Sequence, residues 1–226
     1  MKSFDETWEK IHSEKVWGQY PGESVIRFVA RNFYSANPRK EIKLLDFGCG
    51  DGAITWYLLR EGFDVYAFDG SESAIKNTRA KLEREFGKYD ADLRVRDALE
   101  LDYPENFFDG VIDNACICQN RIANIQKMYD EIARIIKPNG KLFTSGFGKE
   151  TSGYGTGREI EKDTFTDITK GHFSGLGISH FTDEDEMNGI LEKSGFQVLS
   201  SDCYKYSDRG AFVDNLVTIA ERKANI

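Results

Sequence analysis

The sequence is poor in the residues that cross-link, stiffen or anchor a chain. Among its 226 residues are only four cysteines, four prolines and three histidines. It has no run of about eighteen apolar residues, which excludes a transmembrane helix. The first ten residues, MKSFDETWEK, are charged and lack the apolar core of a secretory signal, so we expect a cytoplasmic location. There is no internal repeat and no low-complexity tract, so nothing indicates a second domain.

The cysteines and the charge balance exclude further classes. Cys116 and Cys118 are too close together to form a structural zinc pair without other cysteines or histidines nearby, so we expect free thiols and no metal. Acidic residues outnumber basic ones by 38 to 30, which gives a net charge of -8. An acidic surface repels phosphate backbones, so we do not expect nucleic acid as partner. Without a long apolar run, we do not expect a membrane as partner either.

The stretch that organises the chain is 42–53, IKLLDFGCGDGA. An apolar run ending in Asp46 predicts a buried strand, three glycines follow within five residues, and a helical pattern opens at Ala53. Glycines let a ligand approach the backbone and the helix N-terminus. The spacing Gly48-x-Gly50-x-x-Ala53 also satisfies the loose dinucleotide pattern, so an NAD-dependent oxidoreductase is one alternative. A tight turn without a ligand is another.

Two further acids follow later strands. The strand 65–68 ends in Asp69, and the alternating strand 91–96 ends in Asp97-Ala98. In a doubly wound sheet the end of the second strand lies beside the end of the first, where an acid can accept both hydroxyls of a ribose. A buried carboxylate is costly without a partner. We therefore expect Asp69 to bind a ribose, with helix capping as the alternative.

Together, the glycine loop and these strand-end acids resemble the motifs of the class I S-adenosylmethionine-dependent methyltransferases, over residues 42–145. The resemblance implies that the loop passes under the methionine part of the cofactor, with Asp46 beside it. It also implies that Asp97 receives the exocyclic amine of adenine, with the next backbone N–H at the ring. Surface capping is the alternative for Asp97. The cofactor contacts expected are Asp46, Gly48, Cys49, Gly50, Asp69, Gly70, Asp97, Ala98, Asn114, Trp17 and Tyr20.

The order of the elements predicts an α/β fold: a doubly wound, Rossmann-like sheet of seven mostly parallel strands, with an antiparallel last strand and helices on both faces. The link between the last two strands carries no helical pattern, which predicts a hairpin. The expected strands are 42–46, 65–69, 91–96, 107–114, 141–145, 195–199 and 211–221, and the clearest helices are 53–60, 73–86 and 122–136.

We expect a single domain over 1–226. Its parts are an N-terminal helical arm (1–40), a cofactor-binding core (41–145), a lid or substrate insertion (146–180), and a C-terminal helix and hairpin (181–226). In the arm, Trp17 and Tyr20 cover either the edge of the core or the cofactor.

The insertion is rich in glycine and polar residues over 147–177, and irregular segments longer than about twelve residues are typical of lids and binding loops. It leaves the end of the fifth strand, so it should lie over the cofactor. Its candidates for acceptor contacts are Tyr154, Arg158, His172 and Phe173.

A catalytic base is harder to predict. Members of the resembling family often carry a histidine pair after the fourth strand, where this chain has residues 116–119, CICQ. His180 follows the insertion and precedes a helix near the expected site, so it is the candidate base, with packing or capping as the alternative. A base helps when the acceptor is a neutral hydroxyl or a protonated amine, and matters little for a carboxylate.

The resulting hypothesis is methyl transfer from S-adenosylmethionine to a small soluble acceptor with a hydroxyl, carboxylate or amine group, sugar derivatives included, by a monomer or homodimer. Such a reaction depends mainly on holding two reactants at near-attack distance. A non-catalytic module that binds the cofactor and signals through a partner would carry the same acids and stays open.

Overall fold

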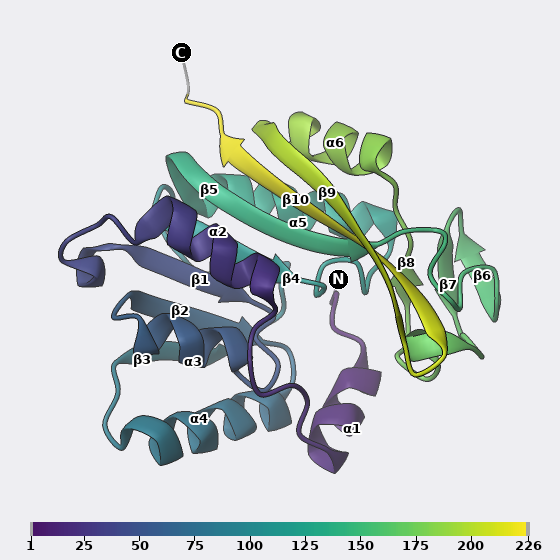
Figure 1. Ribbon diagram of the computed structural model, residues 1–226, viewed down its shortest axis with the longest axis horizontal. Coiled ribbons are helices and arrows are strands. Elements are labelled where there is room, and N and C mark those ends of the chain that lie inside the picture. The colour runs from purple at the N-terminus through teal and green to yellow at the C-terminus, as the bar shows by residue number, and fades with distance from the viewer. Residues whose placement is uncertain (1, 225–226) are drawn as a thin grey trace.

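The computed structural model describes residues 2–224 of the chain. Its main sheet has seven strands: β1 (Lys43–Phe47), β2 (Asp64–Asp69), β3 (Ala91–Val95), β4 (Phe108–Asn114), β5 (Ile136–Phe147), β9 (Phe196–Asp208) and β10 (Ala211–Arg222). They lie in the order β3-β2-β1-β4-β5-β10-β9 (Figure 1). Strands β1 to β5 pair in parallel, whereas β10 is antiparallel to both β5 and β9. The predicted fold class, with its antiparallel last strand, is confirmed.

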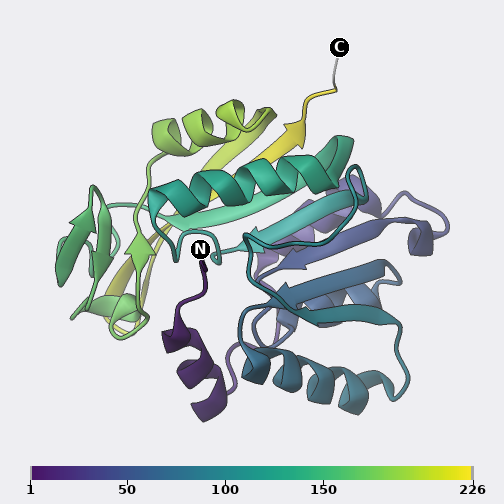
Figure 2. The same ribbon diagram turned by 180° about the vertical axis from the view of Figure 1, so that it is seen from behind.

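Helices cover both faces of this sheet. They are α2 (Glu23–Phe33), α3 (Ala53–Arg60), α4 (Glu72–Phe86), α5 (Ile122–Ile135) and α6 (Glu184–Lys193), whereas α1 (Glu6–Glu14) packs against α4. Apolar side chains of α2, α3 and α4 share one core cluster, and those of α5 and α6 share the cluster on the opposite face, which Figure 2 shows in front. Helix α5 illustrates the cause, because Ile125, Met128 and Ile132 recur at helical spacing and are all buried.

The β9–β10 hairpin is longer than the sequence predicts. Strand β9 continues to Asp208, and its pairing with β10 runs to the turn at Arg209 and Gly210, which both have positive φ (48° and 81°). Residues 202–208 are exposed and pair only with β10, so the polar sequence there gives no alternation of buried and exposed side chains.

The insertion is also more regular than predicted. Strands β6 (Arg158–Glu161), β7 (Thr164–Thr166) and β8 (Ser179–His180) form a small antiparallel sheet. The short 3-10 turn η2 (Gly171–Phe173) lies between β7 and β8 in the chain. Its small core consists of Phe165, Ile168, Phe173 and Phe181. These residues are scattered among polar ones, so no local pattern marks the strands.

Strand β5 differs from the prediction at its start. The sequence predicts a helix to residue 136 and a strand from residue 141, but the strand begins at Ile136, directly after α5. Its pairing with β4 shifts register between Phe108 and Gly110, and Asn139 has a positive φ of 63°. The residues between the predicted helix and the predicted strand therefore form an irregularity inside β5.

Candidate functional site

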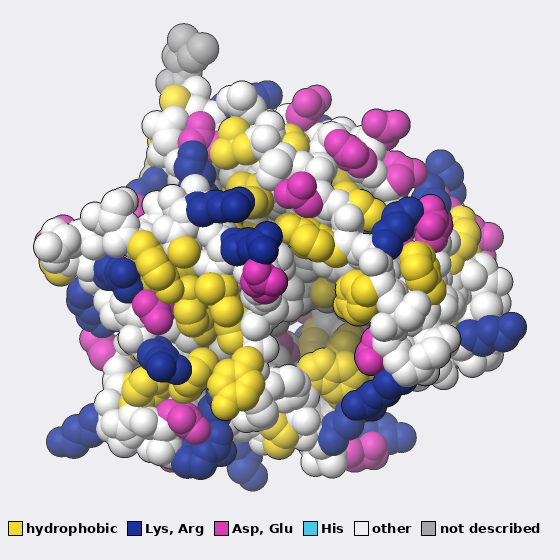
Figure 3. Space-filling model, in the orientation of Figure 1, with side chains coloured by type: hydrophobic (Ala, Val, Ile, Leu, Met, Phe, Trp, Pro, Cys, Tyr) yellow, Lys and Arg dark blue, Asp and Glu magenta, His cyan; other side chains and the backbone are white. Residues whose placement is uncertain are grey.

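A cavity of about 520 Å³ opens at the carboxyl ends of β1, β2 and β4. The arm with α1, the glycine loop, the end of β4, the insertion and the tip of the β9–β10 hairpin all contribute to its lining. Figure 3 shows a hollow on this face with hydrophobic side chains at its rim. The volume lies within the roughly 300–1,000 Å³ typical of small-molecule sites.

The glycine loop between β1 and α3 forms part of this lining. Gly48, Gly50 and Gly52 have φ of 69°, 51° and 75°, in the left-handed region that favours glycine. Space is limited as well, because a Cβ on Gly48 would lie 2.1 Å from the Sγ of Cys116. The loop therefore needs glycine both for its conformation and for its packing.

Asp46, at the end of β1, ties the start of α3 to the sheet. Its Oδ2 accepts hydrogen bonds from the N–H and the hydroxyl of Thr55, at 2.9 and 2.6 Å, and Thr55 is the third residue of the helix. Among the described residues its Oδ1 has no hydrogen-bond partner, and Asp46 lines the cavity. Burial raises its pKa to about 7 against the opposing bonds from Thr55, and the charge of Asp69 adds to the rise.

Asp69, at the end of β2, keeps acceptor capacity for a ligand. Its Oδ2 accepts from the N–H of Gly50 at 2.9 Å, and its Oδ1 accepts from the N–H of Ser71 at 2.8 Å. A carboxylate offers about four acceptor positions, so about two remain free on a residue that lines the cavity. Burial raises its pKa, although these two bonds oppose the rise.

Asp97 differs from the expectation. Its Oδ2 accepts from the backbone N–H groups of Ser3 (2.7 Å) and Phe4 (3.0 Å), and its Oδ1 accepts from the hydroxyl of Ser3 (2.6 Å) and the N–H of Leu99 (2.9 Å). Burial would raise its pKa, but these bonds outweigh it and lower the pKa. All of its roughly four acceptor positions are used, and it does not line the cavity. The carboxylate is thus not presented to an adenine amine.

His12, on α1, lines the cavity and was missed as a candidate. Its Nδ1 lies 3.1 Å from Oδ1 of Asp51, and a Cβ on Gly50 would lie 3.4 Å from its Cε1. Within residues 2–224 its Nε2 has no hydrogen-bond partner. Burial lowers its pKa, but the hydrogen bond to Asp51 and the charge of Asp69 outweigh burial and raise it.

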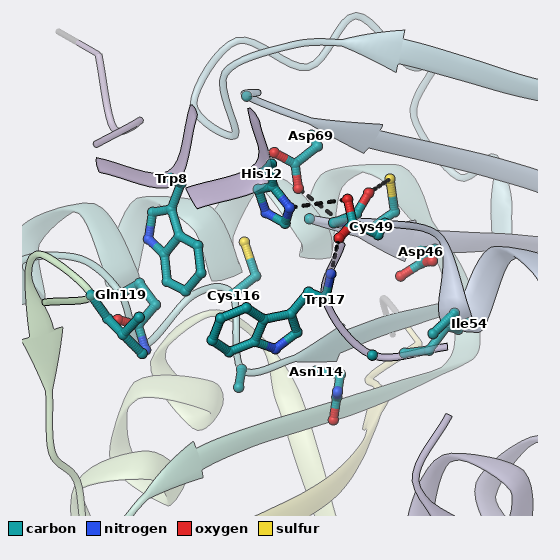
Figure 4. A pocket seen from close by; sticks show the side chains of 18 of the residues that line it. Trp8, His12, Trp17, Asp46, Cys49, Ile54, Asp69, Asn114, Cys116 and Gln119 are labelled. Atoms are coloured by element: carbon teal, nitrogen blue, oxygen red, sulfur yellow. Dashed lines mark hydrogen bonds and ion pairs between the residues drawn. The ribbon is translucent and has the colours of Figure 1, made fainter. Parts of the chain in front are cut away.

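Asp51 is held by further donors from the arm and from α4. It accepts from the backbone N–H of Trp17, and from the side-chain amide of Asn77 at 3.0 Å. Figure 4 shows His12, Trp17 and Asp69 around the same cavity. In the sequence, the sign of this contact is that Asp51 lies between two glycines of the loop. In a simple turn that position would be exposed to solvent, whereas here Asp51 is buried under the arm.

His180, the predicted base, lies outside the cavity. Its side chain is buried (3% exposed), with Nδ1 2.8 Å from the hydroxyl of Thr164 and Nε2 3.2 Å from Oε2 of Glu186. Both ring nitrogens therefore have partners in the insertion and α6. The geometry corresponds to the packing alternative, and the catalytic expectation for His180 is corrected.

The other expected contacts divide clearly. Those that line the cavity, besides the residues above, are Gly48, Cys49, Gly50, Gly70, Ala98, Asn114, Trp17 and Tyr20. From the insertion, His172 and Phe173 also line it. Tyr154 does not, since its hydroxyl donates to Asp163 at 2.6 Å, and Arg158 is exposed at the edge of β6.

Residues 2–224 show neither a metal site nor a helix suited to cross a membrane. No group of three or more His, Cys, Asp or Glu side chains is arranged to hold a metal ion. No described helix is long and apolar enough to cross a membrane. The four cysteines are free thiols, and burial raises the pKa of the two nearest the loop, Cys49 and Cys116.

Comparison with known proteins agrees with this geometry. Residues 45–144 match the family model described as a methyltransferase domain. This region is a methyltransferase domain. It contains the glycine loop, the acids Asp46, Asp69 and Asp97, and strands β2 to β4, so the NAD-dependent alternative is set aside.

The relatives of this methyltransferase domain carry different names. The chain is 27% identical to the human mitochondrial arginine hydroxylase NDUFAF5 over 205 residues, covering 89% of this chain and 55% of that protein. It is 24% identical to the ubiquinone biosynthesis O-methyltransferase of Nitrobacter winogradskyi, covering 85% of this chain and 70% of that one. A solved S-adenosylmethionine-dependent methyltransferase of Methanosarcina mazei aligns with a TM-score of 0.72 at 21% identity, covering 87% of this chain and 98% of that one.

Proposed function

We propose that this protein binds S-adenosylmethionine in the cavity and transfers its methyl group to a small acceptor bearing a hydroxyl, carboxylate or amine, sugar derivatives included. The observation that carries the proposal is Asp69, which faces the cavity beside the glycine loop with about two free acceptor positions. These positions suit the two hydroxyls of a ribose. The cavity volume of about 520 Å³ suits a nucleoside cofactor together with part of an acceptor.

Several residues would hold the cofactor. Asp69 takes the ribose hydroxyls, and the backbone from Gly48 to Gly50 borders the methionine part. Asp46 faces the same part through its free Oδ1 while its Oδ2 fixes α3. The cofactor supplies a methyl group already activated by a sulfonium, so the chain's main task is to position the acceptor.

Transfer to a hydroxyl or amine also releases a proton, and we assign its acceptance to His12. Asp51 holds Nδ1 of His12 in the N–H form, which leaves the lone pair on Nε2 of this cavity-lining residue able to accept a proton. When bound, the cofactor would supply the methyl group, whose bond to the acceptor oxygen or nitrogen would replace its bond to sulfur, with the electron pair left on sulfur. The acceptor's proton passes to Nε2, and from there to solvent.

The relatives support methyl transfer but do not establish it for this chain. One is named an O-methyltransferase and another an arginine hydroxylase, so related chains carry different activities on similar sequences. The non-catalytic module would use the same contacts to Asp69 and the loop. It differs only in lacking turnover, so the two functions separate by experiment.

The first test is calorimetric titration with S-adenosylhomocysteine, with NAD as the control ligand. We expect micromolar binding of the former and none of the latter. The second test incubates the protein with methyl-labelled S-adenosylmethionine and fractionated small metabolites, and follows label into an organic product. Label transfer supports the enzyme, whereas binding with no transfer to any fraction supports the module. Absence of S-adenosylhomocysteine binding would overturn the proposed function.

A further inference from the structure

The residue after Asp69 is a glycine whose backbone does not require one. Gly70 lies outside the positive-φ region, unlike the three glycines of the loop. What excludes a side chain there is the ring of Phe4, because a Cβ on Gly70 would lie 2.1 Å from Cδ2 and 2.6 Å from Cγ of Phe4. The side chain of residue 4 therefore fills the space that a side chain of residue 70 would occupy.

Phe4 is held in this position from both sides. Asp97 accepts three hydrogen bonds from Ser3 and Phe4, as described above. Five residues further on, the carboxylate of Glu9 accepts from the hydroxyls of Ser71 and Ser73, each at 2.6 Å. The first residues of the arm are thus bound to the end of β3, and α1 is bound to the start of α4.

The segment borders the cavity without filling it. Ser3 and Phe4 line the same cavity as Gly70, Arg96 and Ala98, the residues at the ends of β2 and β3. This end of the cavity lies on the far side of Asp69 from the glycine loop, because β1, β2 and β3 are adjacent in the sheet in that order. A cofactor whose ribose is bound by Asp69 would place its purine here, against a wall that includes an aromatic ring.

We propose that Phe4 is a cofactor-binding residue that contacts the purine, and that Asp97 is the positioning residue that holds it there. The carboxylate of Asp97 thus serves the purine through the arm, because its own acceptor positions are taken by Ser3, Phe4 and Leu99. Because the hydrogen bonds to Asp97 hold Ser3 and Phe4 in place, the purine leaves faster when these bonds are lost. This inference rests on the proposed function.

The test measures S-adenosylhomocysteine affinity by calorimetry and its dissociation rate by stopped-flow fluorescence. Phe4→Ala should weaken affinity roughly tenfold, the scale of losing one aromatic contact to a base. Asp97→Ala should raise the dissociation rate by at least the same factor, because it frees Ser3 and Phe4 together. Val16→Ala is the control, an exposed arm residue that does not line the cavity, and should change neither quantity.

A rescue variant separates a ligand contact from general damage to the arm. Gly70→Leu alone should weaken binding, because its side chain collides with Phe4. In the double variant Phe4→Ala/Gly70→Leu the new side chain fills the vacated space, and affinity should recover to within a few-fold of the native protein.

The outcomes are distinct. Unchanged or tighter binding in Phe4→Ala would overturn the inference, since the ring would then be irrelevant or obstructive. Loss of binding in Phe4→Ala without recovery in the double variant would also overturn it. If the native protein itself fails to bind S-adenosylhomocysteine, the proposed function fails instead.

Discussion

His12 and Asp51 stand 39 residues apart in the chain, yet Nδ1 of His12 lies 3.1 Å from Oδ1 of Asp51 at the edge of the cavity. If His12 accepts the acceptor's proton, His12→Gln should lower kcat by roughly 10²–10⁴-fold, the usual contribution of a general base. Affinity for S-adenosylhomocysteine should change little. Once the acceptor is known, steady-state kinetics and calorimetry on the same preparation measure both quantities.

The pH dependence gives a second readout for His12. Because its pKa is raised, the native rate should climb with pH until His12 has lost its proton, and this limb should vanish in His12→Gln. His180→Gln is the matched control, since His180 lies outside the cavity with both ring nitrogens bonded. A rate loss in His180→Gln but not in His12→Gln would reverse the assignment.

Asp69→Ala should weaken S-adenosylhomocysteine binding by roughly 1–3 kcal/mol, the cost of leaving hydrogen-bonding groups without partners. Asp64→Ala is the control on the same strand. Asp64 lies at the opposite end of β2, 2.7 Å from the Lys43 amino group, and should leave affinity unchanged. Calorimetry of folded variants decides the matter, and equal affinities for Asp69→Ala and the native protein would remove Asp69 from the binding site.

The parts of the fold that the sequence predicted are those with local signals. The loop from Asp46 to helix α3 is an example, because its glycines and the helix bounds Ala53–Arg60 are encoded in adjacent residues. The role of Asp97 was not predictable in this way, since its partners Ser3 and Phe4 are more than ninety residues distant. His12 was missed for the same reason, because a short amphipathic helix does not reveal which strand end it covers.

A comparison of Gly48, in the glycine loop, with Gly62, after α3, separates the cost of packing overlap from the cost of backbone strain. Gly48 and Gly62 both have positive φ, at 69° and 86°, but a Cβ on Gly48 would overlap Cys116 whereas nothing lies within 4 Å of one on Gly62. Gly62→Ala should cost about 1 kcal/mol of unfolding free energy from strain alone. Gly48→Ala should cost clearly more and also weaken S-adenosylhomocysteine binding. Urea unfolding and calorimetry compare the pair, and equal costs would mean that Cys116 moves aside freely.

Buried Asp46 predicts how stability depends on pH. Burial raises its folded-state pKa from 3.8 to about 7, so between these values the folded protein retains a proton that the unfolded chain has lost. This contribution to stability is fully present below pH 4 and is lost as pH rises through 7. Asp113, whose pKa burial raises to about 6, and His12 act in the same direction.

Asp46→Asn removes this titration while keeping a carbonyl oxygen that accepts from Thr55. The variant and the native protein should therefore differ least at pH 5, and the variant should gain roughly 1–3 kcal/mol relative to the native protein by pH 8. Urea unfolding at pH 5, 6.5 and 8 measures the change, with Asp90→Asn on the exposed surface as the control. A difference that stays constant over this range would show that Asp46 is ionised throughout, and the free Oδ1 would then face the cavity as a full negative charge.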